Sequence, residues 1–304
     1  MECTFEELEK YCKTNVKNYK NECLAYLIKL LYTHKEKEKR KNIKKNYLTP
    51  LFNWTGSKEE ELPDFIRFTP KKYNYYIDPF IGGGTLFFYL FPKKAIINDI
   101  DPLLINFYKQ IKLKNSSKIE NFMNKTSLNE EKYNKIKNNL HSSNKLTSAK
   151  NLFYVRKLAY KGMNNYDKKG NFITPFENKK IDYSYLSDKR YEKLFSRTKI
   201  YNYSFEKIFE MYGDNPDNFF FLDPPYDAKF KDYGFCDFDR KKQEILAKYF
   251  KESKAKCLMI IGETPFIHNL YKNYIKFTYE KVYRYSIEKK DGKIANNHLV
   301  ITNY

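Results

Sequence analysis

A carboxylate, two prolines and a tyrosine stand together at residues 223–226, directly after four apolar residues. In an open α/β sheet, ligands bind beyond the carboxyl ends of the strands, so this segment would lie at the rim of such a sheet. An exocyclic amine on a planar base is a poor nucleophile, because its lone pair is delocalised. Asp223 and the Pro224 carbonyl can accept its two hydrogens, Pro225 stiffens the turn, and Tyr226 offers a ring for stacking. These four residues are the candidate catalytic group.

A glycine-rich segment, Asp-Pro-Phe-Ile-Gly-Gly-Gly at residues 78–84, also follows an apolar stretch. Glycines after a strand let the backbone approach a ligand and let the next helix N-terminus face it. No Gly-Lys-Ser/Thr follows, which excludes a P-loop, and a full G-x-G-x-x-G is missing, which favours a mononucleoside-like ligand over a dinucleotide. Asp99 ends the next apolar stretch, where a carboxylate can bind ribose hydroxyls. The two segments and Asp99 predict a nucleoside pocket.

The elements that must position these residues alternate in the order of a doubly wound α/β sheet. Strands are predicted at 75–77, 95–97, 219–222 and 257–261, with terminal strands near 277–287 and 298–303. Helices are predicted at 85–90 and 103–111, near 239–252 and near 265–273. A long insert interrupts the sheet: residues 112–150 are polar and predict helices, and residues 151–200 show no clear sheet alternation.

The N-terminal part differs in composition from the rest. Residues 1–34 carry apolar side chains at helical spacing without a proline, which predicts one long or two short amphipathic helices. Residues 35–45 hold seven basic and two acidic groups. This run is typical of a solvated helix end or linker, and it can also contact phosphates.

The charge of the chain indicates a polyanionic partner. Its 304 residues include 57 Lys+Arg against 37 Asp+Glu, a formal net charge of +20. Nucleic acid is the first candidate and a membrane surface the second, while an AT-rich coding sequence is an alternative source of the lysines. The aromatic content of 18% is enough for a sizeable core, which excludes a wholly disordered chain.

Several classes of protein are excluded by what the sequence lacks. No apolar run approaches the ~20 residues needed to cross a bilayer, and residues 1–20 show no secretory signal. The five cysteines form no C-x-x-C pair, and the four histidines are dispersed, so neither a disulfide framework nor a metal site is predicted. We expect a soluble intracellular protein, in the bacterial cytoplasm or, if the source is viral, in the host cell.

These motifs resemble the Dam-type (DPPY) DNA adenine-N6 methyltransferases over most of residues 48–304. The family's opening Trp-x-Gly-x-Lys pattern is matched by residues 54–58, and its other motifs are similar to the glycine-rich segment, Asp99 and residues 223–226. The resemblance implies a Rossmann-like sheet that uses S-adenosylmethionine (SAM) and acts on double-stranded DNA, with the target adenine flipped into the pocket. It implies that the cofactor is bound by Trp54, Lys58, Asp78, Phe80, Gly82, Gly84, Asp99, Ser204, Phe205 and Asp223.

The order of the motifs implies three parts: an N-terminal helical extension (1–46), a catalytic domain (47–112 and 200–304) and an inserted, mainly helical DNA-recognition domain (113–199). The residues implied to contact DNA are Arg156, Lys161, Asn165, Tyr166 and Asp167. Relatives tend to carry Arg and Asn where this chain has Asn165 and Asp167, so the target need not be GATC. They usually carry Ser-Asn where this chain has Gly262-Glu263.

We therefore predict a site-specific DNA methyltransferase that transfers a methyl group from SAM to N6 of adenine, without a covalent enzyme intermediate. The same chemistry on adenine in RNA or on cytosine N4 is an alternative, because the tetrapeptide recognises an amine rather than a whole base. A catalytically silent nucleic-acid-binding subunit is another. The complete set of pocket residues favours an enzyme over a silent subunit. The recognition sequence and the oligomeric state are left open by the sequence.

Overall fold

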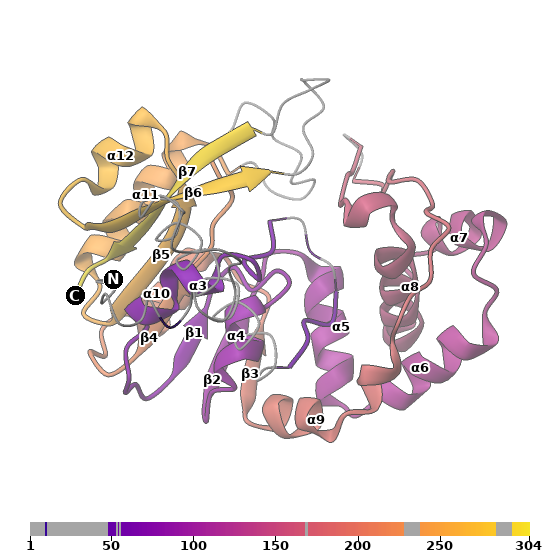
Figure 1. Ribbon diagram of the computed structural model, residues 1–304. Coiled ribbons are helices and arrows are strands. Elements are labelled where there is room, and N and C mark those ends of the chain that lie inside the picture. Colours follow the sequence, from indigo (N-terminus) through magenta and orange to yellow (C-terminus); the bar gives the residue numbers. More distant parts are fainter. Residues whose placement is uncertain are drawn as a thin grey trace.

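The computed structural model describes residues 10, 48–52, 54, 56–167, 170–227, 238–283 and 294–304 (Figure 1). Apart from Lys10, the helices predicted at 1–34 and the basic run at 35–45 lie outside these residues. The helical N-terminal extension is therefore not among the features described below.

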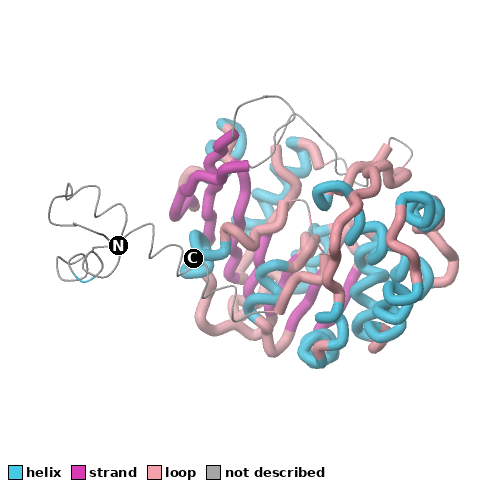
Figure 2. The backbone as a smooth tube through the Cα atoms, turned by 45° about the vertical axis from the view of Figure 1, so that its right-hand side comes forward, coloured by secondary structure: helices cyan, strands magenta, loops and turns pink. Residues whose placement is uncertain are grey.

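Within the described residues the sheet has seven strands in the order β3-β2-β1-β4-β5-β7-β6. The parallel strands are β1 (Tyr76–Asp78), β2 (Ala95–Asn98), β3 (Thr198–Tyr201), β4 (Phe219–Leu222) and β5 (Lys256–Gly262). β7 (Ile294–Thr302) runs antiparallel between β5 and β6 (Ile275–Tyr283). Figure 2 shows the strands of the sheet side by side. The strand order reverses between β1 and β4, and ligands bind at such a switch point.

Helices cover both faces of this sheet. Those before the insert are α3 (Leu62–Phe65), α4 (Thr85–Leu90) and α5 (Pro102–Lys112). The insert and its return to the sheet contain α6 (Ser116–Lys125), α7 (Glu130–Lys137), α8 (Lys145–Leu158) and α9 (Lys189–Ser196). The later helices are α10 (Phe205–Tyr212), α11 (Arg240–Glu252) and α12 (Pro265–Tyr271). Side chains that accept backbone N–H groups cap many of their first turns, among them Asp101, Asn129, Asn144, Asp188, Ser204, Asp239 and Thr264.

Alternate residues of the buried strands explain the two helical layers, because successive side chains of a strand point to opposite faces. In β4, Phe219 and Phe221 belong to the core that contains α4, α5 and α9. Phe220 and Leu222 belong to the core formed with α10, α11 and α12. A short continuous apolar strand, buried on both faces, is what the run before Asp223 predicted.

The insert is joined to the catalytic sheet through α5. Figure 1 shows α6, α7 and α8 on the side of α5 that faces away from the sheet. The rings of Phe107 in α5 and Phe153 in α8 stack with centroids 5.7 Å apart, and Phe52 lies 4.4 Å from Phe107. After α8, antiparallel bridges pair Ala159 with Phe176 and Tyr166 with Phe172, so residues 159–176 fold back on themselves.

The predicted α/β fold is confirmed, with four elements not predicted individually. Each predicted strand and helix within the described residues is present within a few residues of its expected bounds; residues 284–287 of one predicted strand lie outside them. The missed elements are α3, β3, α9 and α10. β3 is an edge strand, and only its first residue, Thr198, is buried, so it lacks an apolar run. No described helix is long and apolar enough to cross a membrane.

Candidate active site

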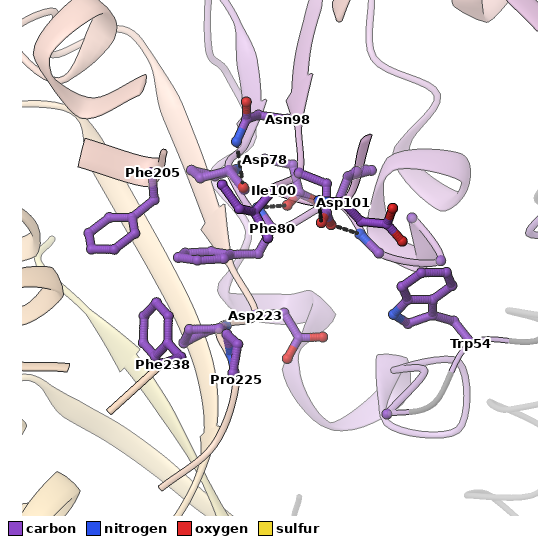
Figure 3. A pocket seen from close by; sticks show the side chains of 18 of the residues that line it. Trp54, Asp78, Phe80, Asn98, Ile100, Asp101, Phe205, Asp223, Pro225 and Phe238 are labelled. Atoms are coloured by element: carbon purple, nitrogen blue, oxygen red, sulfur yellow. Dashed lines mark hydrogen bonds between the residues drawn. The ribbon is translucent and has the colours of Figure 1, made fainter. Parts of the chain in front are cut away.

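A cavity of about 490 Å³ opens at the carboxyl ends of β1, β2 and β4. Its wall contains residues 54–58 in part, the glycine-rich segment, the ends of two strands and the tetrapeptide 223–226. Figure 3 shows the rings of Phe80, Phe205 and Phe238 on one side, the Trp54 indole on the other, and Asp223 between them. The strand order therefore brings three separated sequence motifs into one hollow.

The glycines are required by the close approach of Trp54. Gly82 has a φ of +45°, and a Cβ there would lie 2.8 Å from the indole Nε1. A Cβ at Gly83 would lie 2.7 Å from the Trp54 Cβ. Gly84 has a φ of +71° and directly precedes α4. Larger residues would displace the indole from this loop, so the glycines and Trp54 form one wall of the cavity.

Two carboxylates near the glycine loop, Asp78 and Asp99, accept hydrogen bonds from nearby donors. Asp78 accepts from the Tyr76 hydroxyl (2.8 Å) and the Phe80 amide (3.2 Å). Asp99 accepts from the amides of Gly82 and Asp101, both at 3.0 Å. Burial raises the pKa of Asp78 well above its usual value, and burial raises the pKa of Asp99 to about 7. Asp99 therefore both shapes the glycine loop and offers a titratable acceptor to the cavity.

Asparagine side chains connect this carboxylate segment to the next wall. The Asn98 amide donates to the carbonyls of Pro79 and Tyr203, both at 3.0 Å, and its oxygen accepts from the Tyr203 amide at 2.8 Å. Asn202 donates to the carbonyl of Asp99 at 2.8 Å. Ser204 is the N-cap of α10, accepting from the Lys207 amide. These bonds fix where α10 begins relative to β2.

An aromatic cluster forms the adjoining wall. The ring centroids of Phe80 and Phe205 are 5.5 Å apart, those of Phe80 and Phe238 are 5.7 Å apart, and those of Phe205 and Phe238 are 5.6 Å apart. Lys242 lies 5.8 Å from the Phe205 ring and pairs with Glu206 at 2.6 Å. The sequence motifs indicated Phe80 and Phe205, but they carried no signal for Phe238 or Lys242.

Asp223, at the end of β4, is joined to Lys58 from the opening motif. The Lys58 Nζ lies 2.7 Å from one carboxylate oxygen and 2.8 Å from the other, and it also donates to the Gly56 carbonyl at 2.8 Å. Lys58 is only 3% exposed. Burial raises the pKa of Asp223, and the Lys58 ammonium opposes that rise. The pair fixes the direction of the carboxylate within the cavity.

The rest of the tetrapeptide is supported from behind. The Gln243 amide of α11 donates to the Pro225 carbonyl at 2.7 Å. The Lys58 Nζ lies 5.2 Å from the centroid of the Tyr226 ring. A Cβ on Gly262 would lie 3.1 Å from that ring, so this departure from the family's usual Ser leaves space for the tyrosine. Lys58 therefore contacts both ends of the tetrapeptide.

The comparison with protein families decides the class of this site. A model described as D12 class N6 adenine-specific DNA methyltransferase matches residues 54–287. The chain belongs to this family. The match includes the glycine loop, Asp99, the insert and the tetrapeptide.

Named relatives of this methyltransferase agree with that assignment. The Type II methyltransferase M.CviBI of Paramecium bursaria Chlorella virus NC1A is 36% identical over 263 residues, covering 84% of this chain and 100% of that relative. The Type II methyltransferase M1.LlaDCHI of Lactococcus lactis subsp. cremoris is 29% identical, covering 84% and 96% of the two chains. A DNA adenine methylase of Haemophilus influenzae is 25% identical, covering 83% and 92%.

Arg156, one of the residues predicted to contact DNA, is buried in the structure. It is 1% exposed, its guanidinium stands 4.7 Å from the Trp54 ring centroid, and Nη1 donates to the Met163 carbonyl at 3.1 Å. Burial lowers the pKa of Arg156 to about 10. The side chain packs against Trp54 in the wall of the cavity, because α8 lies against the opening motif, and a contact of Arg156 with DNA stays a prediction.

The other four insert residues are divided between the cavity, the hairpin and the surface. Asn165 lines the cavity, and Lys161 is exposed. Tyr166 is buried against Phe172, with ring centroids 5.3 Å apart. Both oxygens of Asp167 accept from Asn171, one from its amide N–H and one from its side chain, each at 2.9 Å. Tyr166 and Asp167 thus organise the hairpin, and DNA contacts by these residues stay a prediction.

The catalytic and cofactor-binding residues predicted from sequence all line the one cavity, and their individual roles stay predictions. Asn98, Asn202, Phe238, Lys242 and Gln243 were missed. Asn98 had a signal, its place at the end of a strand beside Asp99. The described residues contain no group of three His, Cys, Asp or Glu side chains able to hold a metal ion.

Proposed function

We propose that this protein binds SAM in the cavity and transfers its methyl group to N6 of an adenine flipped out of duplex DNA. The observation that carries the proposal is the position of Asp223. It ends β4, in the same cavity as the glycine loop, Asp99 and the aromatic cluster. The carboxylate that would accept the amine hydrogens and the wall that would bind a nucleoside therefore line the same cavity. The family description names adenine N6 in DNA as the acceptor class.

The residues on the cofactor side fit SAM. A side chain at position 82 or 83 would clash with Trp54. With glycine at both positions, the loop can present its backbone to a ligand. Asp99 would accept the ribose hydroxyls, and Phe80 and Phe205 would enclose the adenine ring. SAM supplies an electrophilic methyl group on a sulfonium, whose positive charge suits a wall that contains Asp78 and Asp223.

The acceptor side has the groups that an aromatic amine requires. The Asp223 carboxylate and the Pro224 carbonyl would accept hydrogen bonds from the two N6 hydrogens, which would turn the nitrogen lone pair away from the ring and towards the donor. As the N6–methyl bond forms and the sulfur–methyl bond breaks, N6 would release one of these protons to Asp223 or to water. Lys58 holds both carboxylate oxygens, so Asp223 is oriented before the base enters. Tyr226 stacks on the base. Positioning two bound partners in this way can supply most of the rate enhancement.

Duplex binding is proposed to rest on the basic insert and on phosphate contacts. The formal charge of +20 is large for a chain of 304 residues. Each phosphate that is neutralised contributes roughly −0.9 to the slope of log K against log salt concentration. A steep negative slope for duplex DNA supports this assignment, and a slope near zero removes it.

The target sequence is proposed to contain adenine without being restricted to GATC. Asn165 lines the cavity, and an asparagine there cannot make the bidentate guanine contact that an arginine makes, worth about 1–3 kcal/mol. Long-read sequencing of a plasmid methylated in vitro tests this. Methylation confined to GATC, with every GATC filled, contradicts it. A broader or different motif supports it, and Asn165→Arg should then tighten that motif.

The reaction itself is tested by the identity of the product. Purified protein is incubated with methyl-labelled SAM and duplex DNA, single-stranded DNA or RNA, and the digested nucleosides are separated. We expect label in N6-methyladenine from duplex DNA. Label in N4-methylcytosine, or only from RNA, would replace the proposed acceptor. SAM binding without transfer to any substrate would support a silent subunit.

A further inference from the structure

A buried acid–histidine pair lies behind the tetrapeptide. His298 of β7 approaches Glu61 with its Nδ1 2.6 Å from the Glu61 Oε2, and the Tyr279 hydroxyl of β6 donates to the same oxygen at 2.6 Å. Glu61 is 3% exposed and His298 is 1% exposed. β6 and β7 thus place Tyr279 and His298 against Glu61, behind the tetrapeptide. None of these three side chains has a role in the methyl transfer proposed above.

This pair touches the catalytic residues from two directions. The His298 ring meets the Tyr226 ring edge-on, with centroids 5.3 Å apart and planes at 86°. Glu61 closes the turn that begins at Lys58: the amides of Glu61 and Leu62 donate to the Lys58 carbonyl at 3.0 and 2.9 Å. One pair therefore supports the ring proposed to stack on the base and the backbone of the lysine that orients Asp223.

Charged groups around the pair favour the ionised form of Glu61. Lys281 of β6 lies 3.5 Å from the Glu61 Oε1 and 3.4 Å from Glu60. Burial opposes ionisation of Glu61, but the His298 bond, the Lys58 charge and the Tyr279 bond together lower its pKa to about 2. Asp223 and Tyr226 face the pair from the tetrapeptide. Glu61 therefore favours its ionised form, and its Oε2 lies at hydrogen-bond distance from both His298 and Tyr279.

We propose that the Glu61–His298 pair is a positioning device for the acceptor side of the active site, which holds the Tyr226 ring and the Lys58 turn in place for the flipped base. The proposal rests on the proposed function. It adds two positioning residues that no sequence motif indicated, and it gives the C-terminal strands a part in methyl transfer. It predicts losses in the transfer step and in base stacking that exceed any loss of cofactor affinity, because Lys58 is also expected to contact the cofactor.

The test compares His298→Ala with His298→Asn, whose amide can still donate to Glu61. His268→Ala is the matched control, since His268 makes a similar contact of 2.8 Å with Glu263 but is 53% exposed. Single-turnover methyl transfer is measured with SAM and duplex saturating. Calorimetry gives SAM affinity, and 2-aminopurine fluorescence at the target position reports stacking of the flipped base.

We expect His298→Ala to slow transfer by up to about 100-fold, with a much smaller change in SAM affinity and an altered 2-aminopurine signal, because small misplacements of reacting groups are costly. His298→Asn should recover most of the rate, and His268→Ala should match the wild type. Wild-type rate in His298→Ala, a loss of SAM affinity as large as the loss of rate, or no recovery in His298→Asn would overturn the proposal. If His298→Ala does not fold, Tyr279→Phe replaces it with the same criteria. A wild-type protein that methylates no adenine contradicts the proposed function instead.

Discussion

The two sides of the cavity hold their carboxylates by different means. On the cofactor side, Asp78 and Asp99 accept from backbone amides and a tyrosine hydroxyl, and among the described residues neither is paired with a basic side chain. On the acceptor side, Asp223 is paired with Lys58, and Glu61 with His298. Burial raises the pKa of Asp99 to about 7, whereas the pKa of Glu61 is lowered to about 2.

This difference indicates what each side must do. A carboxylate without a cation can change its protonation near neutral pH and respond to a ligand, which suits a residue proposed to bind ribose hydroxyls. A carboxylate fixed by a buried cation keeps one direction, which suits a group proposed to orient an amine. The cofactor side is thus built to respond to a ligand, and the acceptor side is built to be rigid.

The largest expected effect comes from breaking the acceptor-side pair. Lys58→Met leaves Asp223 in a largely buried position without its cation, and losing one partner of a buried pair costs about 3–5 kcal/mol of folding stability. Denaturant unfolding measures this loss. The matched control is Arg190→Met, because Arg190 pairs with Asp188 at 2.6 Å but is 61% exposed, and we expect little change there. Equal losses in the two variants would remove the distinction between the buried and exposed pairs.

A smaller effect is expected from titrating the cofactor side. Ribose hydroxyls donate to a carboxylate, so they favour the ionised form of Asp99. SAM affinity should therefore rise with pH by up to about tenfold per unit below pH 7 and level off above it. Calorimetry between pH 6 and pH 8 measures the slope. Asp99→Asn should flatten it, while titrations of SAM itself persist in the variant; an unchanged slope in Asp99→Asn would assign the dependence to another group.

The smallest effect is expected from the support beneath Trp54. Arg156→Lys keeps the charge but loses the planar contact, which should weaken SAM binding by about 0.5–2 kcal/mol. The salt dependence of DNA binding should not change, because the side chain is buried. Lys150→Met is the control. Lys150 lies in α8, as Arg156 does, and its Nζ is 5.8 Å from the centroid of the Phe122 ring, but it does not line the cavity. In Arg156→Met, which also removes the charge, a reduced salt slope would support the predicted DNA contact.

The contrast between the two sides also explains what the sequence could predict. The cofactor side is local: Asp99 bonds to Gly82, 17 positions away, and the glycine loop directly follows its strand. Its motifs were therefore visible. On the acceptor side, Lys58 and Asp223 are 165 positions apart in the sequence, and Glu61 and His298 are 237 positions apart. Only the order of the strands in the sheet brings these side chains together. The motifs predicted that Lys58 and Asp223 line one pocket, but not that they form an ion pair. The Glu61–His298 pair was missed because two side chains far apart in the sequence form no pattern.

The same reasoning accounts for Arg156 and β3. An arginine in a basic insert is typical of phosphate contact, but the packing of α8 against Trp54 buries it. β3 pairs with β2 through its backbone, and its mixed side chains give no alternation that a sequence could show. The backbone pairing of β3 and the packing of α8 against Trp54 are thus further features that the residue pattern did not contain.

The most direct test of the account is the single-turnover rate of labelled methyl transfer to duplex DNA by Asp223→Ala. Asp227→Ala is the matched control, because that nearby carboxylate accepts from Arg240 and Thr264 instead of Lys58. Circular dichroism shows whether each variant is folded. The account predicts that folded Asp223→Ala loses about 10²–10³-fold or more in rate, as expected when a preorganised polar group is removed, while Asp227→Ala stays close to the wild type. A folded Asp223→Ala protein that transfers methyl groups at nearly the wild-type rate would contradict it.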